Sequence, residues 1–118
     1  VRTDAPGDGA LAALAAAHPR LSLLNLGASD VTDPGPLAAL PRLRALGLAE
    51  APITDRSFAG LAAAPRLAEL TISNTGVTAA AVAELARLPA LLRLDARGTA
   101  LAADPLLPLV RRGVEIQR

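Results

Sequence analysis

The chain has 118 residues and a formal net charge of +1, with twelve arginines, eleven acidic residues, and neither lysine nor cysteine. Its length suits one domain, and the absence of cysteine excludes disulfides, thiolate metal ligands and a cysteine nucleophile. A balanced charge without a basic stripe or aromatic platforms argues against nucleic-acid binding, and no apolar run is long enough to span a bilayer.

The side chains available for a core are almost all aliphatic. Hydrophobic residues make up 52% of the chain, but Phe58 is the only aromatic one. A compact single core normally uses large rings to fill space. This composition therefore favours thin, regular layers in which side chains of one size stack on copies of themselves.

The first predicted element is a helix in the alanine-rich stretch that ends near Ala17. His18 follows this helix. The helix dipole favours a partial positive charge at the C-terminal end, which suits a histidine there. As the only histidine, it has no second ligand for a metal and no partners for a catalytic triad. We therefore expect His18 to mark a helix end and not a reactive centre.

Four prolines then mark a repeat, because Pro19, Pro41, Pro65 and Pro89 lie 22, 24 and 24 residues apart. The first three begin the tripeptide "PRL" and the fourth begins "PAL". Aliphatic residues recur at fixed offsets after each proline, and their alternation predicts a short strand with one buried face. The residues five positions after the prolines are Leu24, Leu46, Leu70 and Leu94.

A helical segment is predicted after each strand. In "AAAVAELARL", Val82, Leu85, Ala86 and Leu88 fall on one stripe of a helix. Pairs such as Asp33-Pro34 and Asp104-Pro105 indicate a cap followed by proline at the first helical position. Further prolines at 36 and 108 favour short or 3₁₀ segments in the first and fourth repeats. Four threonines are interpreted as caps and ladder residues: Thr32, Thr54, Thr78 and Thr99.

A strand and a helix within 24 residues form one coil of a solenoid, which buries its faces only by stacking on further coils. We expect five parallel strands and four or five helical segments, with the four leucines above in one interior column. The final residues, 113–118, predict a closing strand with Val114 and Ile116 facing inward. Because solenoid ends need a polar cap, we expect further chain upstream or a neighbouring molecule at the N-terminal end.

These positions match L-x-x-L-x-L-x-x-N/C-x-L, so the chain resembles the leucine-rich repeat family, and within it bacterial members with 24-residue repeats of the ribonuclease-inhibitor-like or GALA-like type. The matching links are "SDVTDP", "APITDR" and "NTGVTA". The resemblance implies a right-handed α/β solenoid with a parallel sheet on its concave side and short helices or 3₁₀ segments on its convex side. Ala51 and Ala96 depart from the pattern, so we expect irregularity in their coils. One domain, 1–118, is divided into a half repeat 1–18, repeats 19–40, 41–64, 65–88 and 89–112, and the closing strand 113–118.

The outward positions of the strands hold the candidate site. They fall four, six and eight residues after each proline. They are mostly small and uncharged in the N-terminal half but charged or polar in the C-terminal half. The candidate partner-binding residues are Glu69, Thr71, Ser73, Arg93, Asp95 and Arg97. Strands lie about 4.8 Å apart, so Glu69 is expected to reach Arg93. The competing interpretation is a solvated face with ion pairs worth about 0–1 kcal/mol each.

The predicted function is a non-enzymatic protein-interaction module or scaffold that binds a protein partner through the concave face. The alternatives are a structural segment of a longer solenoid whose ends carry the contacts, with self-association through the N-terminal end, and, as a weaker case, a hydrolase. No cofactor, metal, nucleic acid or membrane is expected. The lack of cysteine favours the cytoplasm, while a secreted or effector role stays open.

Overall fold

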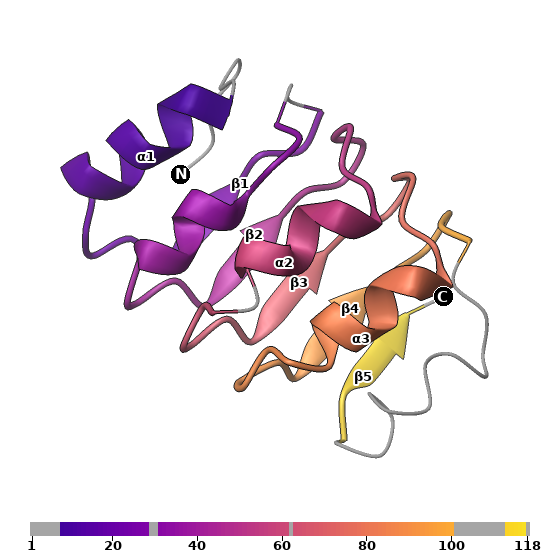
Figure 1. The fold of residues 1–118 in the computed structure, drawn as a ribbon. Coiled ribbons are helices and arrows are strands. Elements are labelled where there is room, and N and C mark those ends of the chain that lie inside the picture. The colour runs from indigo at the N-terminus through magenta and orange to yellow at the C-terminus, as the bar shows by residue number, and fades with distance from the viewer. Residues whose placement is uncertain (1–7, 29–30, 62, 101–112, 118) are drawn as a thin grey trace.

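The computed structural model describes residues 8–28, 31–61, 63–100 and 113–117. It forms two layers, a sheet and a row of short helices, which advance together along the chain (Figure 1). The helices are α1 (Asp8–Ala17), α2 (Phe58–Leu61) and α3 (Val82–Leu85), with 3₁₀ helices η1 (Gly35–Ala39), η2 (Asp55–Ser57) and η3 (Ala79–Ala81). The strands are β1 (Leu23–Asn25), β2 (Ala45–Gly47), β3 (Glu69–Thr71), β4 (Arg93–Asp95) and β5 (Glu115–Gln117).

The five strands form one parallel sheet in sequence order, β1-β2-β3-β4-β5. The register pairs the middle residues of neighbouring strands, and these are Leu24, Leu46, Leu70, Leu94 and Ile116. The four leucines are buried and Ile116 packs partly against them. This confirms the predicted interior column, in which each buried leucine contributes about 1.5–3 kcal/mol through the hydrophobic effect.

The helical layer is shorter than the sequence pattern suggested. The stretch predicted as one helix around Val82 is divided into η3 and α3, although Val82, Leu85 and Leu88 are buried as the stripe required. In the first repeat, η1 is a 3₁₀ helix, as the prolines predicted. It begins one residue later than expected, because Pro34 occupies the cap position and Asp33 Oδ1 accepts the N–H of Gly35 at 2.9 Å.

A left-handed residue follows each of the first four strands, and the sequence analysis did not predict this. Ala28, Glu50, Asn74 and Gly98 have φ of 57°, 62°, 56° and 74° and lie nine residues after the four prolines. A left-handed conformation costs a residue other than glycine about 1–2 kcal/mol. The backbone N–H groups of Ala28, Glu50 and Asn74 each donate to the next coil, over 2.8–3.0 Å. These hydrogen bonds extend the sheet beyond its strands and offset the cost.

Hydroxyl and carboxylate groups link successive coils in the segments that connect the strands to the helical layer. Asp55 accepts the backbone N–H of Thr78 at 2.6 Å and also its hydroxyl, and Ser57 Oγ donates to the carbonyl of Thr32 at 2.6 Å. The hydroxyl of Thr78 in turn accepts the N–H of Ala80 at 3.3 Å, as its predicted capping role requires. These links fix the convex loops of successive coils relative to one another.

Within the coils, Thr75 and Thr99 donate to the carbonyls of Ile72 and Ala96 at 2.7 and 2.6 Å. Ala51 occupies the equivalent position without a hydroxyl, yet its backbone N–H still donates to the carbonyl of Leu48 at 3.2 Å. Its coil, and that of Ala96, keep the sheet register. The expected irregularity at these two alanines is therefore wrong, because the turn at Ala51 forms through the backbone alone and Ala96 is buried at its core position despite the smaller side chain.

The N-terminal end of the stack is covered by α1, which packs against η1 and buries Leu11 (Figure 1). His18 directly follows this helix, where it was predicted, and its N–H donates to the carbonyl of Leu14 at 3.0 Å. At the other end, Val114 is buried and β5 completes the five predicted strands. The predicted cap at Asp104-Pro105 and the fourth helical segment lie outside the described residues, as do residues 1–7.

Candidate functional site: the concave face

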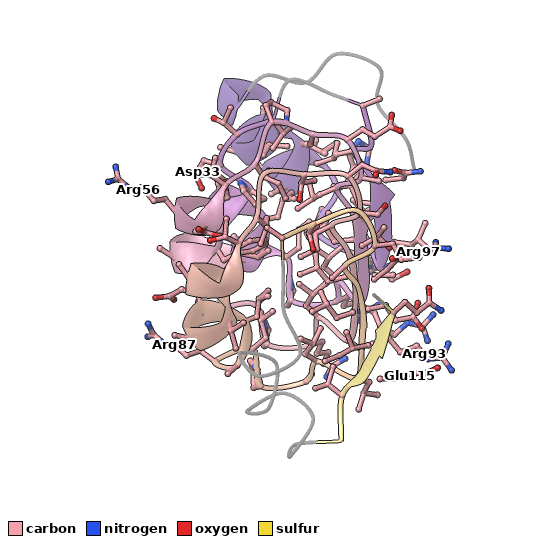
Figure 2. The ribbon with its side chains drawn as sticks, turned by 90° about the vertical axis from the view of Figure 1, so that its right-hand side faces the viewer. Asp33, Arg56, Arg87, Arg93, Arg97 and Glu115 are labelled. Carbon is pink, nitrogen blue, oxygen red and sulfur yellow. The ribbon has the colours of Figure 1, made fainter. Side chains whose placement is uncertain are left out.

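Figure 2 separates the two surfaces of the solenoid, with Arg93, Arg97 and Glu115 on the sheet side and Arg56 and Arg87 on the helical side. Alternate residues of a strand point to opposite faces, so the first and third residues of each strand form two rows on the concave face. The first row is Leu23, Ala45, Glu69, Arg93 and Glu115, and the second row is Asn25, Gly47, Thr71, Asp95 and Gln117.

The C-terminal half of the first row alternates in charge. Arg93 lies between two carboxylates, with its Nη1 3.9 Å from Glu69 Oε1 and its Nε 3.5 Å from Glu115 Oε2. The three side chains are 53–67% exposed, so solvent screens these pairs. The contact between Glu69 and Arg93 is the one expected from strand spacing. Glu115 was not among the predicted site residues, although the inward positions expected for Val114 and Ile116 place it on the outward face.

Asp95 and Arg97 form a fixed pair beside this row. The guanidinium donates twice, from Nε to Oδ1 at 2.9 Å and from Nη2 to Oδ2 at 2.8 Å, and the backbone N–H of Arg97 also reaches Oδ1 at 3.2 Å. These hydrogen bonds from Arg97 lower the pKa of Asp95, against an opposing effect of burial. The pKa of Arg97 is raised, chiefly by the same side-chain hydrogen bond. Two parallel charge-assisted bonds fix the plane of the guanidinium.

The two hydroxyl residues of the candidate set differ in accessibility. Thr71 is half-buried in the second row, beside Asp95. Ser73 is only 9% exposed, since it lies where the chain turns inward before Asn74, and its carbonyl accepts the N–H of Glu50 at 3.0 Å. Ser73 therefore offers less surface than the other five predicted residues.

The concave face carries two shallow depressions. One, of about 200 Å³, lies over β3, β4 and β5 and is lined by Glu69, Leu70, Thr71, Arg93, Leu94, Asp95, Glu115 and Gln117. The other, of about 190 Å³, lies over β1, β2 and β3 and is lined by Leu23, Leu24, Asn25, Ala45, Leu46, Gly47, Glu69 and Thr71. The first therefore collects four of the six predicted residues and adds Glu115 and Gln117, while Ser73 and Arg97 lie outside its lining.

The charged side chains of this surface are paired, and His18 lies apart from them. Among the described residues, no three histidine, cysteine or acidic side chains come together as metal ligands. His18 lines neither depression. The charged groups pair with one another, and a surface of paired charges and amide groups can accept or donate hydrogen bonds to a partner without a chemical step.

Comparisons with known proteins agree with this architecture. A leucine-rich-repeat protein of Leptospira interrogans superposes with a TM-score of 0.63 and 19% identity over 83% of this chain and 25% of its own. Internalin C2 of Listeria monocytogenes superposes with a TM-score of 0.56 and 26% identity over 78% of this chain and 49% of its own. The chain thus spans about a quarter and about half of these two proteins. No family model and no curated protein matches it.

The repeat, the parallel sheet and these structural neighbours show that the chain has the leucine-rich-repeat fold that its sequence predicted, which it shares with these two bacterial proteins. Its architecture is the expected right-handed α/β solenoid. In the described part of the chain, no helix combines the length and the apolar character needed to cross a bilayer.

Proposed function

We propose that the protein binds a protein partner through its concave sheet face, with the charged rows of β3, β4 and β5 as the centre of contact. Leucine-rich repeats are protein-interaction modules in general, and the structural neighbours support that coarse assignment. The observation that carries the proposal is the depression of about 200 Å³ whose lining holds Glu69, Arg93, Asp95 and Glu115.

Preorganisation supports this choice of surface. Immobilising a flexible side chain on binding costs about 0.5–1.5 kcal/mol. The guanidinium of Arg97 is already held by Asp95, and that of Arg93 lies between two glutamates. A partner therefore meets one guanidinium, that of Arg97, whose position is already set. Arginine is also among the residues that most often dominate binding energy at protein interfaces.

The test is a charge reversal with a matched control on the opposite side. The chain has no lysine, so an amine-reactive biotin reagent labels its terminal amine alone and leaves every side chain unmodified. The labelled protein captures partners from a lysate of the source organism. Arg93→Glu with Arg97→Glu should change the set of captured partners, whereas Arg56→Glu with Arg87→Glu, on the helical side (Figure 2), should leave it unchanged. Unchanged capture by the concave variant refutes the proposal.

A second function is favoured by the lengths of the structural neighbours. The chain spans 25% and 49% of the two solved proteins, and repeats of this kind stack on one another. It would then be one segment of a longer solenoid or assembly whose ends carry the contacts, including self-association through the N-terminal end. Sedimentation velocity over a hundredfold concentration range tests this. A monomer at every concentration refutes the self-association, and concentration-dependent dimers that survive the concave variant support it.

A non-enzymatic role and a cytoplasmic location complete the proposal. The structural neighbours suggest an interaction fold. The lack of cysteine supports a reducing compartment. Turnover in a broad hydrolase screen that disappears with His18→Ala contradicts the first, and recovery of the protein outside the cytoplasmic fraction of the source cells contradicts the second.

A further inference from the structure

The two depressions form one trough that crosses all five strands. Glu69 and Thr71 line both of them, so the two depressions adjoin over β3. Neighbouring strands of a sheet are about 4.8 Å apart, so the distance from β1 to β4 is about 14 Å. A protein segment lying in this trough runs across the strands. At each strand it contacts one outward residue from each of the two rows.

The N-terminal end of the trough is apolar, and its side chains over β2 are small. Leu23 is 53% exposed, one of two large hydrophobic side chains so exposed in the described part of the chain, and it lies beside Ala45. Asn25 Oδ1 accepts the N–H of Gly27 at 2.9 Å, and a Cβ at Gly47 would come within 3.0 Å of this oxygen. The small residue at 47 therefore keeps this end open to a partner's apolar side chain.

The C-terminal end carries a residual negative charge. Glu69, Asp95 and Glu115 oppose Arg93 and Arg97, which leaves a net charge of −1. Both guanidiniums already face carboxylates. Glu69 and Glu115 each approach Arg93 through one oxygen, Oε1 and Oε2 respectively, so each has a second oxygen that can accept a hydrogen bond from a partner. The complementary group is therefore a cation.

We infer that the partner's binding segment is an extended stretch that places an apolar side chain on Leu23 and Ala45 and an arginine or lysine on the carboxylate oxygens of Glu69 and Glu115 that do not face Arg93. This inference rests on the proposed function and specifies the chemistry of its partner. An extended chain advances about 3.3–3.4 Å per residue, so a span of about 14 Å separates the two side chains by about four residues.

A second copy of this chain centred on Arg93 is disfavoured. A two-fold axis through Arg93 would bring Arg93 onto its own copy and Glu69 onto the copy's Glu115, because these residues are in register on neighbouring strands. Every pair formed about this axis has like charges, which oppose association.

Peptide selection tests the inference directly. A random 12-residue library displayed on phage is panned against the chain biotinylated at its terminal amine. We expect enriched sequences with a basic residue three to five positions from a leucine, isoleucine or valine, in either order. An enriched peptide, labelled with a fluorophore, should then lose about tenfold in affinity with Glu69→Gln plus Glu115→Gln, because two partly exposed charge pairs are removed.

Three controls isolate the charge and the apolar contact. Leu23→Ser should weaken the same peptide, and replacement of the peptide's basic residue by glutamine should weaken binding to the wild type but not to the double glutamine variant. Glu84→Gln, on α3 of the helical side, removes one carboxylate elsewhere and should change nothing. Affinity should fall between 0.1 and 1 M salt, since the screening length shrinks from about 10 to about 3 Å.

The outcomes separate this inference from the proposed function. Peptides that lose binding with Arg93→Glu and Arg97→Glu but show no basic preference overturn the inference and leave the concave site in place. Peptides indifferent to every concave variant count against both. A library without enriched sequences overturns the inference alone, because lysate capture tests the proposed function separately. Dimers of the wild type that Arg93→Glu dissociates also overturn the inference.

Discussion

Replacing Gly98 by alanine should destabilise the protein through the turn after β4. The residue has φ of 74°, and a side chain in this region costs about 1–2 kcal/mol. An added Cβ would also overlap the side-chain oxygen of Asn74 in the preceding coil and lie 3.3 Å from its backbone nitrogen. Asn74 is exposed and its side chain can move aside, so the crowding costs about 1 kcal/mol, the low end for an added carbon. We therefore expect Gly98→Ala to lower the free energy of unfolding by about 2–3 kcal/mol.

Urea unfolding followed by circular dichroism measures this change, with an unchanged slope of free energy against urea as evidence that the unfolded state is comparable. Gly76→Ala is the matched control, because its φ is not positive and its Cβ would meet only the carbonyl of Ile53 at 3.5 Å. In an Asn74→Ala background the overlap is absent, so Gly98→Ala should cost only the backbone share. A loss below about 0.5 kcal/mol for Gly98→Ala in the wild type, the range of ordinary surface changes, would refute the reasoning.

Four further substitutions test the core, the exposed face of the sheet, a turn and the charged pair. Leu70→Ala should lower the free energy of unfolding by about 2–5 kcal/mol in the same urea assay, because it opens a cavity in the leucine column. Leu23→Ala, on the exposed face of the same sheet, should change it by less than about 0.5 kcal/mol. Thr99→Val should cost about 0.5–1.5 kcal/mol, since it removes the hydroxyl that donates to the carbonyl of Ala96; no loss would contradict that role. The pKa of Asp95 is lowered in the folded state, so its stabilising effect is present above the unfolded-state value of about 3.9 and is lost as the pH falls through the lower folded value. The urea midpoint of Asp95→Asn should therefore be lower than that of the wild type at pH 6 and converge with it in strong acid, and a constant difference down to pH 2 would contradict this assignment.

The sheet could be predicted because its determinants recur. Leu24, Leu46, Leu70 and Leu94 lie at one offset from the repeated proline, and a side chain needed at the same place in every coil is visible in a single sequence. The outward rows follow from strand alternation alone, which is why the contact between Glu69 and Arg93 was expected.

The left-handed turns could not be predicted in this way. Alanine, glutamate, asparagine and glycine fill the same position after successive strands, and only asparagine and glycine suggest such a conformation. The bond from Thr78 to Asp55 was hidden for a different reason, because it joins residues 23 positions apart through side chains. Likewise, the burial of Ser73 depends on where the chain turns, which hydrophobic periodicity does not specify.

In this parallel register, the residues that stabilise the fold are different from the residues exposed on the concave face. Each strand bonds only to its immediate neighbours, and the outward residues of the sheet take no part in the leucine column. Duplication or loss of a complete 24-residue unit therefore preserves the interior while shifting the outward rows by one strand. Genetic recombination can therefore rearrange the outward rows by whole repeats, and point substitutions can alter single outward residues, while the leucine column stays unchanged.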